Sequence, residues 1–159
     1  MKYKKILRTV VALIVICIVF CLYPDSFDQP VPGEHTRVPG TVSGTRSSGN
    51  QAQIENLYRK RQSDVVVQVT AEVARLLPDD NDGSRHQKFI LALDSGHTVL
   101  VSHNIDLAPR VQSLQRYDSV TVKGEYEWTE RGGVIHWTHH DPAGRHEGGW
   151  IEHQGRRYD

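Results

Sequence analysis

The sequence predicts a mainly β protein with one small barrel of five strands, preceded by an N-terminal membrane helix or signal. Three observations support this fold class. Short segments alternate apolar and polar residues, they occur in the order of three strands, a short helix and two strands, and an apolar run with a basic start precedes them. That order of elements is typical of a five-stranded OB barrel, which presents a concave face and loops to ligands.

The first 23 residues predict a membrane anchor or a signal peptide. Residues 1–8 contain four Lys or Arg and no acid, and residues 10–23 are apolar apart from two cysteines and the Tyr23 hydroxyl. A signal peptidase needs small residues at the −3 and −1 positions, and Leu22-Tyr23-Pro24 offers none, which favours an uncleaved anchor over a cleaved signal. The basic flank should stay cytoplasmic, so we expect one span of the inner membrane with the domain in the periplasm. The alternative is secretion to the periplasm after signal cleavage.

Composition divides the remainder into a linker and a domain. Residues 24–50 are rich in Pro, Gly, Ser and Thr and predict a flexible linker, followed by a domain at residues 51–159. Residues 24–159 contain 15 Lys and Arg against 19 Asp and Glu, a net charge of −4. This balance does not favour nucleic acid as a partner, because such surfaces need clustered basic side chains. Both cysteines lie in the apolar run, so the domain depends on its core and not on disulfides.

The elements of the domain follow from local periodicity. Residues 51–62 place apolar side chains at helical spacing and predict a short leading helix. Residues 105–114 predict a short helix between the third and fourth strands, with Asp106 as its cap and Pro109 in its first turn. Gly124 lies where a barrel strand often needs a kink. Alternation predicts the five strands at residues 65–77, 86–93, 98–104, 119–128 and 134–139.

Five strings in this domain are similar to those of one bacterial family. They are LPDDNDGSRHQKFIL at residues 77–91, VSHNIDLAPRV at 101–111, GEYEW at 124–128, GGVIHWTHHDPAGRH at 132–146 and GGWIEHQGRRY at 148–158. In this order they resemble the uncharacterised family DUF3465, over about residues 65–159. The resemblance implies a small exported bacterial domain and supplies no activity.

Residues 132–150 form the candidate functional segment, because they hold four of the nine histidines and an Asp-Pro bend. His136, His140 and His146 are the candidate metal ligands, for zinc or another divalent metal. His136 and His140 would lie about 13 Å apart in a regular strand, so they share an ion only if the chain bends at residues 139–142. Since the sequence has no metal-binding signature motif, hydrogen-bonded structural histidines and acid–base histidines are the alternatives.

A second set of polar residues is expected at the rim of the barrel, where strand ends gather. His86 begins the second strand, and His103 and Asn104 end the third. We expect these residues, with Arg110 and Trp137, to contribute to ligand binding. The alternatives are a buried His103 that is hydrogen-bonded to the backbone and an Arg110 that is solvated at the surface.

The fold and its expected location predict a binding function. We expect an exported, membrane-tethered OB-like domain that binds a ligand or partner in the bacterial envelope, either an envelope protein or a saccharide. The alternative is a metal-dependent hydrolase of the phosphodiesterase or nuclease type, with the histidine cluster holding the metal and Asp141 or Glu147 as base. A tethered interaction protein without pocket chemistry is a third alternative. The sequence identifies no catalytic residue and leaves open whether the protein is an enzyme.

Overall fold

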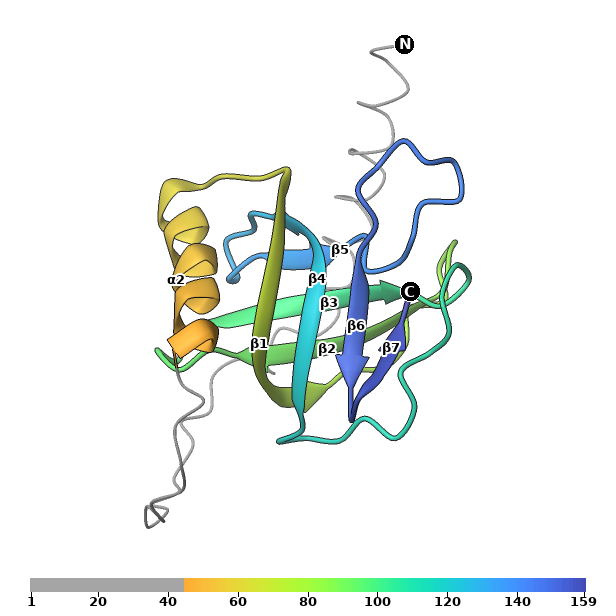
Figure 1. Ribbon diagram of the computed structural model, residues 1–159, viewed down its shortest axis with the longest axis horizontal. Coiled ribbons are helices and arrows are strands. Elements are labelled where there is room, and N and C mark those ends of the chain that lie inside the picture. The colour runs from red at the N-terminus through yellow and green to blue at the C-terminus, as the bar shows by residue number, and fades with distance from the viewer. Residues whose placement is uncertain (1–44) are drawn as a thin grey trace. The chain divides into compact units, whose positions relative to one another are not determined.

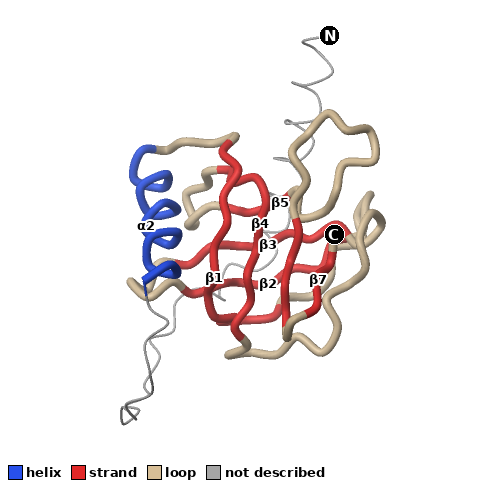
Figure 2. Tube along the Cα trace, in the orientation of Figure 1, coloured by secondary structure: helices blue, strands red, loops and turns tan. Residues whose placement is uncertain are grey.

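The computed structural model describes residues 45–159, which form one helix followed by seven strands (Figure 1). In Figure 2 the strands curve into a barrel, and the helix lies beside the first strand. The predicted anchor at residues 1–23 lies outside the described residues. Within residues 45–159, no helix is long and apolar enough to cross a membrane. The elements are α2 (Thr45–Lys60), β1 (Val65–Leu76), β2 (His86–Ala92), β3 (Thr98–Asn104), β4 (Ser119–Glu127), β5 (Val134–His136), β6 (Trp150–His153) and β7 (Arg156–Tyr158).

Five of these strands close the barrel in the order β1-β2-β3-β5-β4, and β4 pairs back with β1. β1 has 12 residues, which is long enough to pair with β4 along its first part and with β2 at its end. Its register shifts between Val73 and Arg75, where the strand changes partner. β3 and β5 run parallel, whereas the other four pairs of the barrel are antiparallel. The predicted five-stranded barrel is therefore confirmed.

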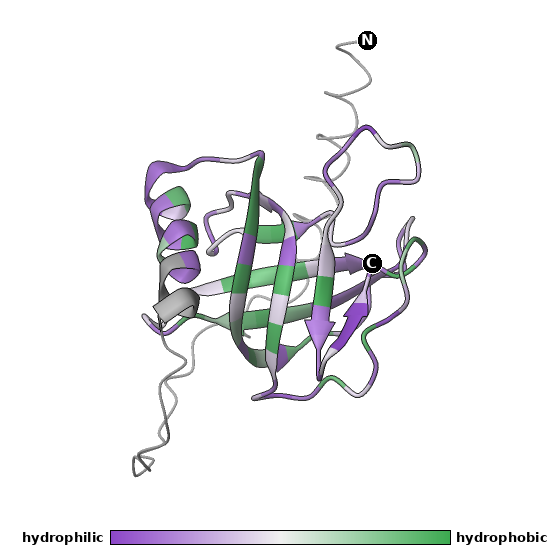
Figure 3. Ribbon diagram, viewed as in Figure 1, coloured by the Kyte–Doolittle hydropathy of each residue, from purple (hydrophilic) through white to green (hydrophobic). Residues whose placement is uncertain are grey.

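The core follows the alternation of the strands, which Figure 3 shows as apolar and polar residues along β1 and β4. One face of each strand points into the barrel and is buried there. α2 adds Ile54 and Leu57, both buried, which pack into the same cluster. The fully buried residues of the core include Val69, Val73, Phe89, Leu91, Val99, Val101, Val122, Tyr126, Ile135 and Ile151.

The short helix predicted between the third and fourth strands is wrong, because residues 105–118 contain turns and no helix. Backbone groups of this segment bond to barrel side chains instead. Buried Gln87 donates to the carbonyl of Val111 at 3.1 Å and accepts from its N–H at 2.9 Å. His103 Nε2 lies 3.0 Å from the carbonyl oxygen of Pro109. These hydrogen bonds satisfy backbone polar groups of the segment in a non-helical conformation, and together they outweigh its weak local helix propensity.

The larger differences from the prediction concern two element boundaries and the C-terminal hairpin. The leading helix begins at Thr45, earlier than residue 51, and β5 ends at His136 because Trp137 adopts a positive φ of 53°. The C-terminal hairpin of β6 and β7 was not predicted. Its turn residues, Gln154 and Gly155, have φ of 51° and 74°, as a tight two-residue turn requires. Gln-Gly is a weaker hairpin signal than Asn-Gly, so the hairpin was hard to find from sequence.

Candidate metal centre

Two carboxylates and one imidazole come together where β4 and β5 pair. Strand register places His136 directly opposite Glu125. Glu127 lies two residues further along β4 and shares the outward face, because Tyr126 between them is fully buried in the core. One ligand atom from each of the three side chains lies within 4.8 Å of the others. The side chains are 16%, 14% and 24% exposed for Glu125, Glu127 and His136, so the cluster is largely shielded from water.

The spacing of these atoms leaves room for an ion. His136 Nε2 lies 3.7 Å from Glu125 Oε1 and 3.9 Å from Glu127 Oε1, which is too long for a hydrogen bond. The same nitrogen is buried and has no hydrogen-bond partner among the described residues. A ligand atom sits about 2.1 Å from a bound transition metal, so two ligands of one ion can be up to about 4.2 Å apart. Both measured separations meet this limit.

A third carboxylate raises the negative charge of the cluster. Asp64 directly precedes β1, and the pairing of Val65 with Tyr126 brings it beside Glu127. Repulsion by Glu127 is the largest cause that raises the pKa of Asp64 above its ordinary value, and burial is the second largest. Burial alone would raise the pKa of Glu127 too, but interactions with His136 and Ser63 outweigh it and lower that pKa. Carboxylates crowded in this way favour a bound cation.

His146 reaches the cluster from the loop at residues 137–149. Its Nε2 lies 2.7 Å from Glu125 Oε2, and its Nδ1 lies 2.7 Å from the carbonyl oxygen of Glu147. Both neighbours are acceptors, so both ring nitrogens must carry a proton when both bonds form. Burial would lower the pKa of His146, but these two bonds outweigh it and raise that pKa. The ring also stacks on Trp137, with centroids 4.4 Å apart and planes inclined by 11°.

Asp141 gives the loop its shape. Its carboxylate accepts hydrogen bonds from the backbone N–H groups of Ala143, Arg145 and His146, at 2.9, 2.7 and 3.0 Å. These bonds lower the pKa of Asp141 below its ordinary value. Asp141 therefore acts as the centre of a turn that returns His146 to the barrel. A bend at this place was predicted, and it brings His146 to Glu125.

The three predicted metal ligands do not all lie in one cluster. His136 belongs to the cluster and His146 contacts it, whereas His140 is exposed and lies outside it. His139 is buried, and its Nδ1 lies 2.7 Å from the carbonyl oxygen of His140. Glu125 and Glu127 were not among the predicted ligands. Their signal was present in the sequence, because two glutamates flank an inward Tyr126 in a strand that alternates strictly.

The predicted rim residues occupy separate environments. His86 and Asn104 are cross-strand neighbours on β2 and β3. His103 is fully buried, with Nδ1 2.8 Å from the Thr138 hydroxyl and Nε2 on a backbone carbonyl, and burial lowers its pKa. Arg110 forms a surface ion pair with Asp79. Trp137 stacks on His146, as described above.

Comparison with known proteins adds one finding. A family model described as "Protein of unknown function (DUF3465)" matches residues 38–159. No curated protein matches the chain. The match agrees with the resemblance of the sequence strings and extends it toward the N-terminus.

Proposed function

The chain belongs to the DUF3465 family, and from its β4–β5 cluster we propose that the barrel is a divalent-metal-binding domain. Glu125, Glu127 and His136 are the metal ligands. One observation carries this proposal: His136 Nε2 is buried with no hydrogen-bond partner in residues 45–159, and it lies 3.7 and 3.9 Å from two carboxylate oxygens. A buried polar atom with no partner is costly, and a metal ion would satisfy it.

The donor set limits the choice of ion. Carboxylates suit hard cations and imidazole suits zinc, iron and other transition metals, so a mixed set favours Mn²⁺, Fe²⁺ or Zn²⁺ over Ca²⁺. His146 Nε2 lies 2.7 Å from Oε2 of Glu125, the oxygen that does not face His136. In metal sites, outer-shell groups commonly orient a ligand through a hydrogen bond of this kind. Three protein ligands leave at least one coordination position for water or a bound molecule.

The metal-loaded barrel serves, in this proposal, as a binding module of the OB type. The order of the barrel strands supports this type, with β1 shared between β2 and β4. The anchor predicted at residues 1–23 would hold the module at the periplasmic face of the inner membrane, where an envelope protein or saccharide is its partner. The hydrolase alternative gains no support from the family match, which supplies no activity.

Metal titration of the full-length chain tests the proposal. The protein is purified without a histidine tag, stripped with a chelator, and titrated with Mn²⁺, Zn²⁺ and Mg²⁺ in a calorimeter. We expect one transition-metal ion per chain, and weaker binding by at least about tenfold in Glu127→Gln and in His136→Asn. At a free concentration of about 100 Kd, the ion should raise the free energy of unfolding by about 2.7 kcal/mol.

Two matched substitutions control for general effects of charge and of histidine content. Glu130→Gln changes an exposed glutamate close to Glu127 in sequence, and His140→Asn changes the exposed histidine of the same segment. Both variants should bind metal like the unmodified chain. Absence of binding by all three ions, or equal losses in His136→Asn and His140→Asn, would contradict the proposal.

A further inference from the structure

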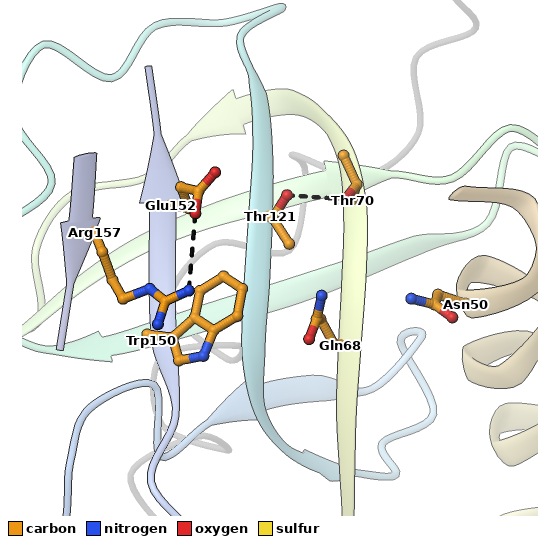
Figure 4. A pocket seen from close by; sticks show the side chains of 7 residues that line it. All are labelled: Asn50, Gln68, Thr70, Thr121, Trp150, Glu152 and Arg157. Atoms are coloured by element: carbon orange, nitrogen blue, oxygen red, sulfur yellow. Dashed lines mark hydrogen bonds and ion pairs between the residues drawn. The ribbon is translucent and has the colours of Figure 1, made fainter. Parts of the chain in front are cut away.

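A second, separate feature lies on the outer face of the barrel. A hollow of about 540 Å³ opens over β1, β4, β6 and β7 and is bounded on one side by α2. In Figure 4 the Trp150 ring extends from β6 toward β4, and Gln68 extends toward β4 from the opposite side. The volume lies within the range of about 300–1,000 Å³ that is usual for small-molecule sites. Seven residues line it: Asn50, Gln68, Thr70, Thr121, Trp150, Glu152 and Arg157.

Strand register explains why these side chains meet. Thr70 pairs with Thr121 across β1 and β4, and Thr121 pairs in turn with Glu152 on β6. Glu152 then pairs with Arg157 on β7. The four side chains therefore form one outward row across four adjacent strands. The hydroxyl oxygens of Thr70 and Thr121 lie 2.8 Å apart, so this part of the row is already ordered.

An aromatic ring with a fixed cation forms one side of the hollow. The Arg157 guanidinium carbon lies 4.1 Å from the centroid of the Trp150 ring. An Arg157 nitrogen lies 3.9 Å from a Glu152 carboxylate oxygen. The two charges balance within the hollow, and both side chains keep hydrogen-bonding capacity for a ligand. Trp150 is half-buried, so part of the indole remains available in the hollow.

We propose that this hollow binds a neutral saccharide. The amides of Asn50 and Gln68 and the hydroxyl of Thr121 offer both donors and acceptors, which suits sugar hydroxyl groups. The Arg157–Glu152 pair bonds adjacent hydroxyl groups of one sugar, and the C–H face of a sugar ring packs on the indole of Trp150.

Other ligand classes fit the lining less well. An anionic ligand would need uncompensated positive charge, but Arg157 faces Glu152, and Lys123 on the same face of β4 is 2.8 Å from Glu147. Single-stranded nucleic acid would need a basic groove with several aromatic rings, whereas Trp150 is the one aromatic residue among those that line the hollow. A neutral, hydrogen-bonding ligand remains.

Binding of soluble oligosaccharides to the full-length chain tests this inference. The probes are neutral hexasaccharides of glucose with α and β linkages and a tetrasaccharide of N-acetylglucosamine, followed by calorimetry and by tryptophan fluorescence. We expect at least one probe to bind, and its affinity to fall by at least about tenfold in Trp150→Ala and in Gln68→Ala. Gln68 is exposed, so its loss should leave the fold intact. Trp150→Phe should retain part of the affinity.

Two neighbouring residues provide matched controls. Arg157→Gln should weaken binding, whereas Arg156→Gln should not, because Arg156 lies over Tyr158 and outside the lining. Titrations with a chelator present keep the test separate from the metal proposal, since the lining shares no residue with the metal cluster. The inference is overturned if none of the probes binds, if binding is unchanged in Gln68→Ala and Trp150→Ala, or if a single-stranded oligonucleotide binds here instead.

Discussion

Gly124 controls how closely β4 and β5 approach, and Gly124→Ala should separate them. A methyl group at this position would lie 2.3 Å from the backbone oxygen of His136. It would also lie 2.9 Å from the Cγ2 atoms of Ile135 and of Thr138. Carbon and oxygen atoms that are not bonded normally stay about 3.3 Å or more apart, so β5 would have to retreat by about 1 Å.

The cost of this retreat can be estimated from the structure. β5 has three residues and pairs with both β3 and β4, so it closes the barrel and has little freedom to move. Overpacking of this kind typically costs about 1–3 kcal/mol, and a clash with backbone belongs at the upper end. Alanine recovers about 0.4–1 kcal/mol by restricting the unfolded chain. We therefore expect Gly124→Ala to lower the free energy of unfolding by about 2 kcal/mol.

Gly148→Ala is the matched control for this substitution. A methyl group at Gly148 would lie 3.4 Å from the Cα atom of His140, which is ordinary contact. The substitution should therefore be neutral or stabilise by up to about 1 kcal/mol. Urea unfolding of the full-length chain, followed by tryptophan fluorescence with a chelator present, measures both variants. Equal stability of Gly124→Ala and the unmodified chain, within about 0.5 kcal/mol, would refute the steric reasoning.

Two other predictions concern pH and the helix. Burial lowers the pKa of His103, so the folded chain binds fewer protons at this residue than the unfolded chain does. The contribution of His103 to the free energy of unfolding is therefore complete above about pH 6.5, and it is lost as the pH falls through the folded-state pKa. Urea unfolding at a series of pH values should show this loss, and the free energy of unfolding should depend less steeply on pH in His103→Gln. Equal slopes in the two proteins would contradict the prediction. Burial also lowers the pKa values of His86 and His139, so these residues should account for the slope that remains in the variant. In α2, buried Gln51 donates to the Thr70 carbonyl at 2.9 Å and accepts from the Asp94 N–H at 2.7 Å. Gln51→Ala should cost about 1–3 kcal/mol in thermal unfolding, against little change for the exposed Gln53→Ala, and equal effects would argue against these bonds.

Alternation was enough to locate the five strands of the barrel. Each of the five predicted strands corresponds to an observed one, because inward residues such as Val69 and Val122 repeat with a period of two that no helix shares. The segment at residues 105–118 could not be predicted in the same way. Its path depends on Gln87, which lies 24 positions before Val111 in the chain and bonds to its backbone. Local propensity contains no information about such partners.

Only His136 of the candidate metal cluster was predicted, because its partners are again residues distant in sequence. Histidine frequency drew attention to residues 132–150, and His136 is in the cluster there. Its partners are carboxylates from β4, and only strand register identifies them, because Glu125 and His136 are neighbours in space but 11 positions apart in the chain. A sequence-based search that paired outward residues of the fourth and fifth strands could have found the set.

The same alternation places the two proposed sites on one row of β4. Thr121 lines the hollow, and Glu125 belongs to the metal cluster about 13 Å further along the strand. Lys123 lies between them and pairs with Glu147 of the loop at residues 137–149. A long saccharide that left the hollow along β4 would meet this ion pair before the proposed metal ligands. Glu147 is exposed, and surface pairs contribute little to stability, so such a ligand could displace it without disturbing the barrel. Contact of one ligand with both proposed sites therefore requires loop side chains to move, but it requires no rearrangement of the strands.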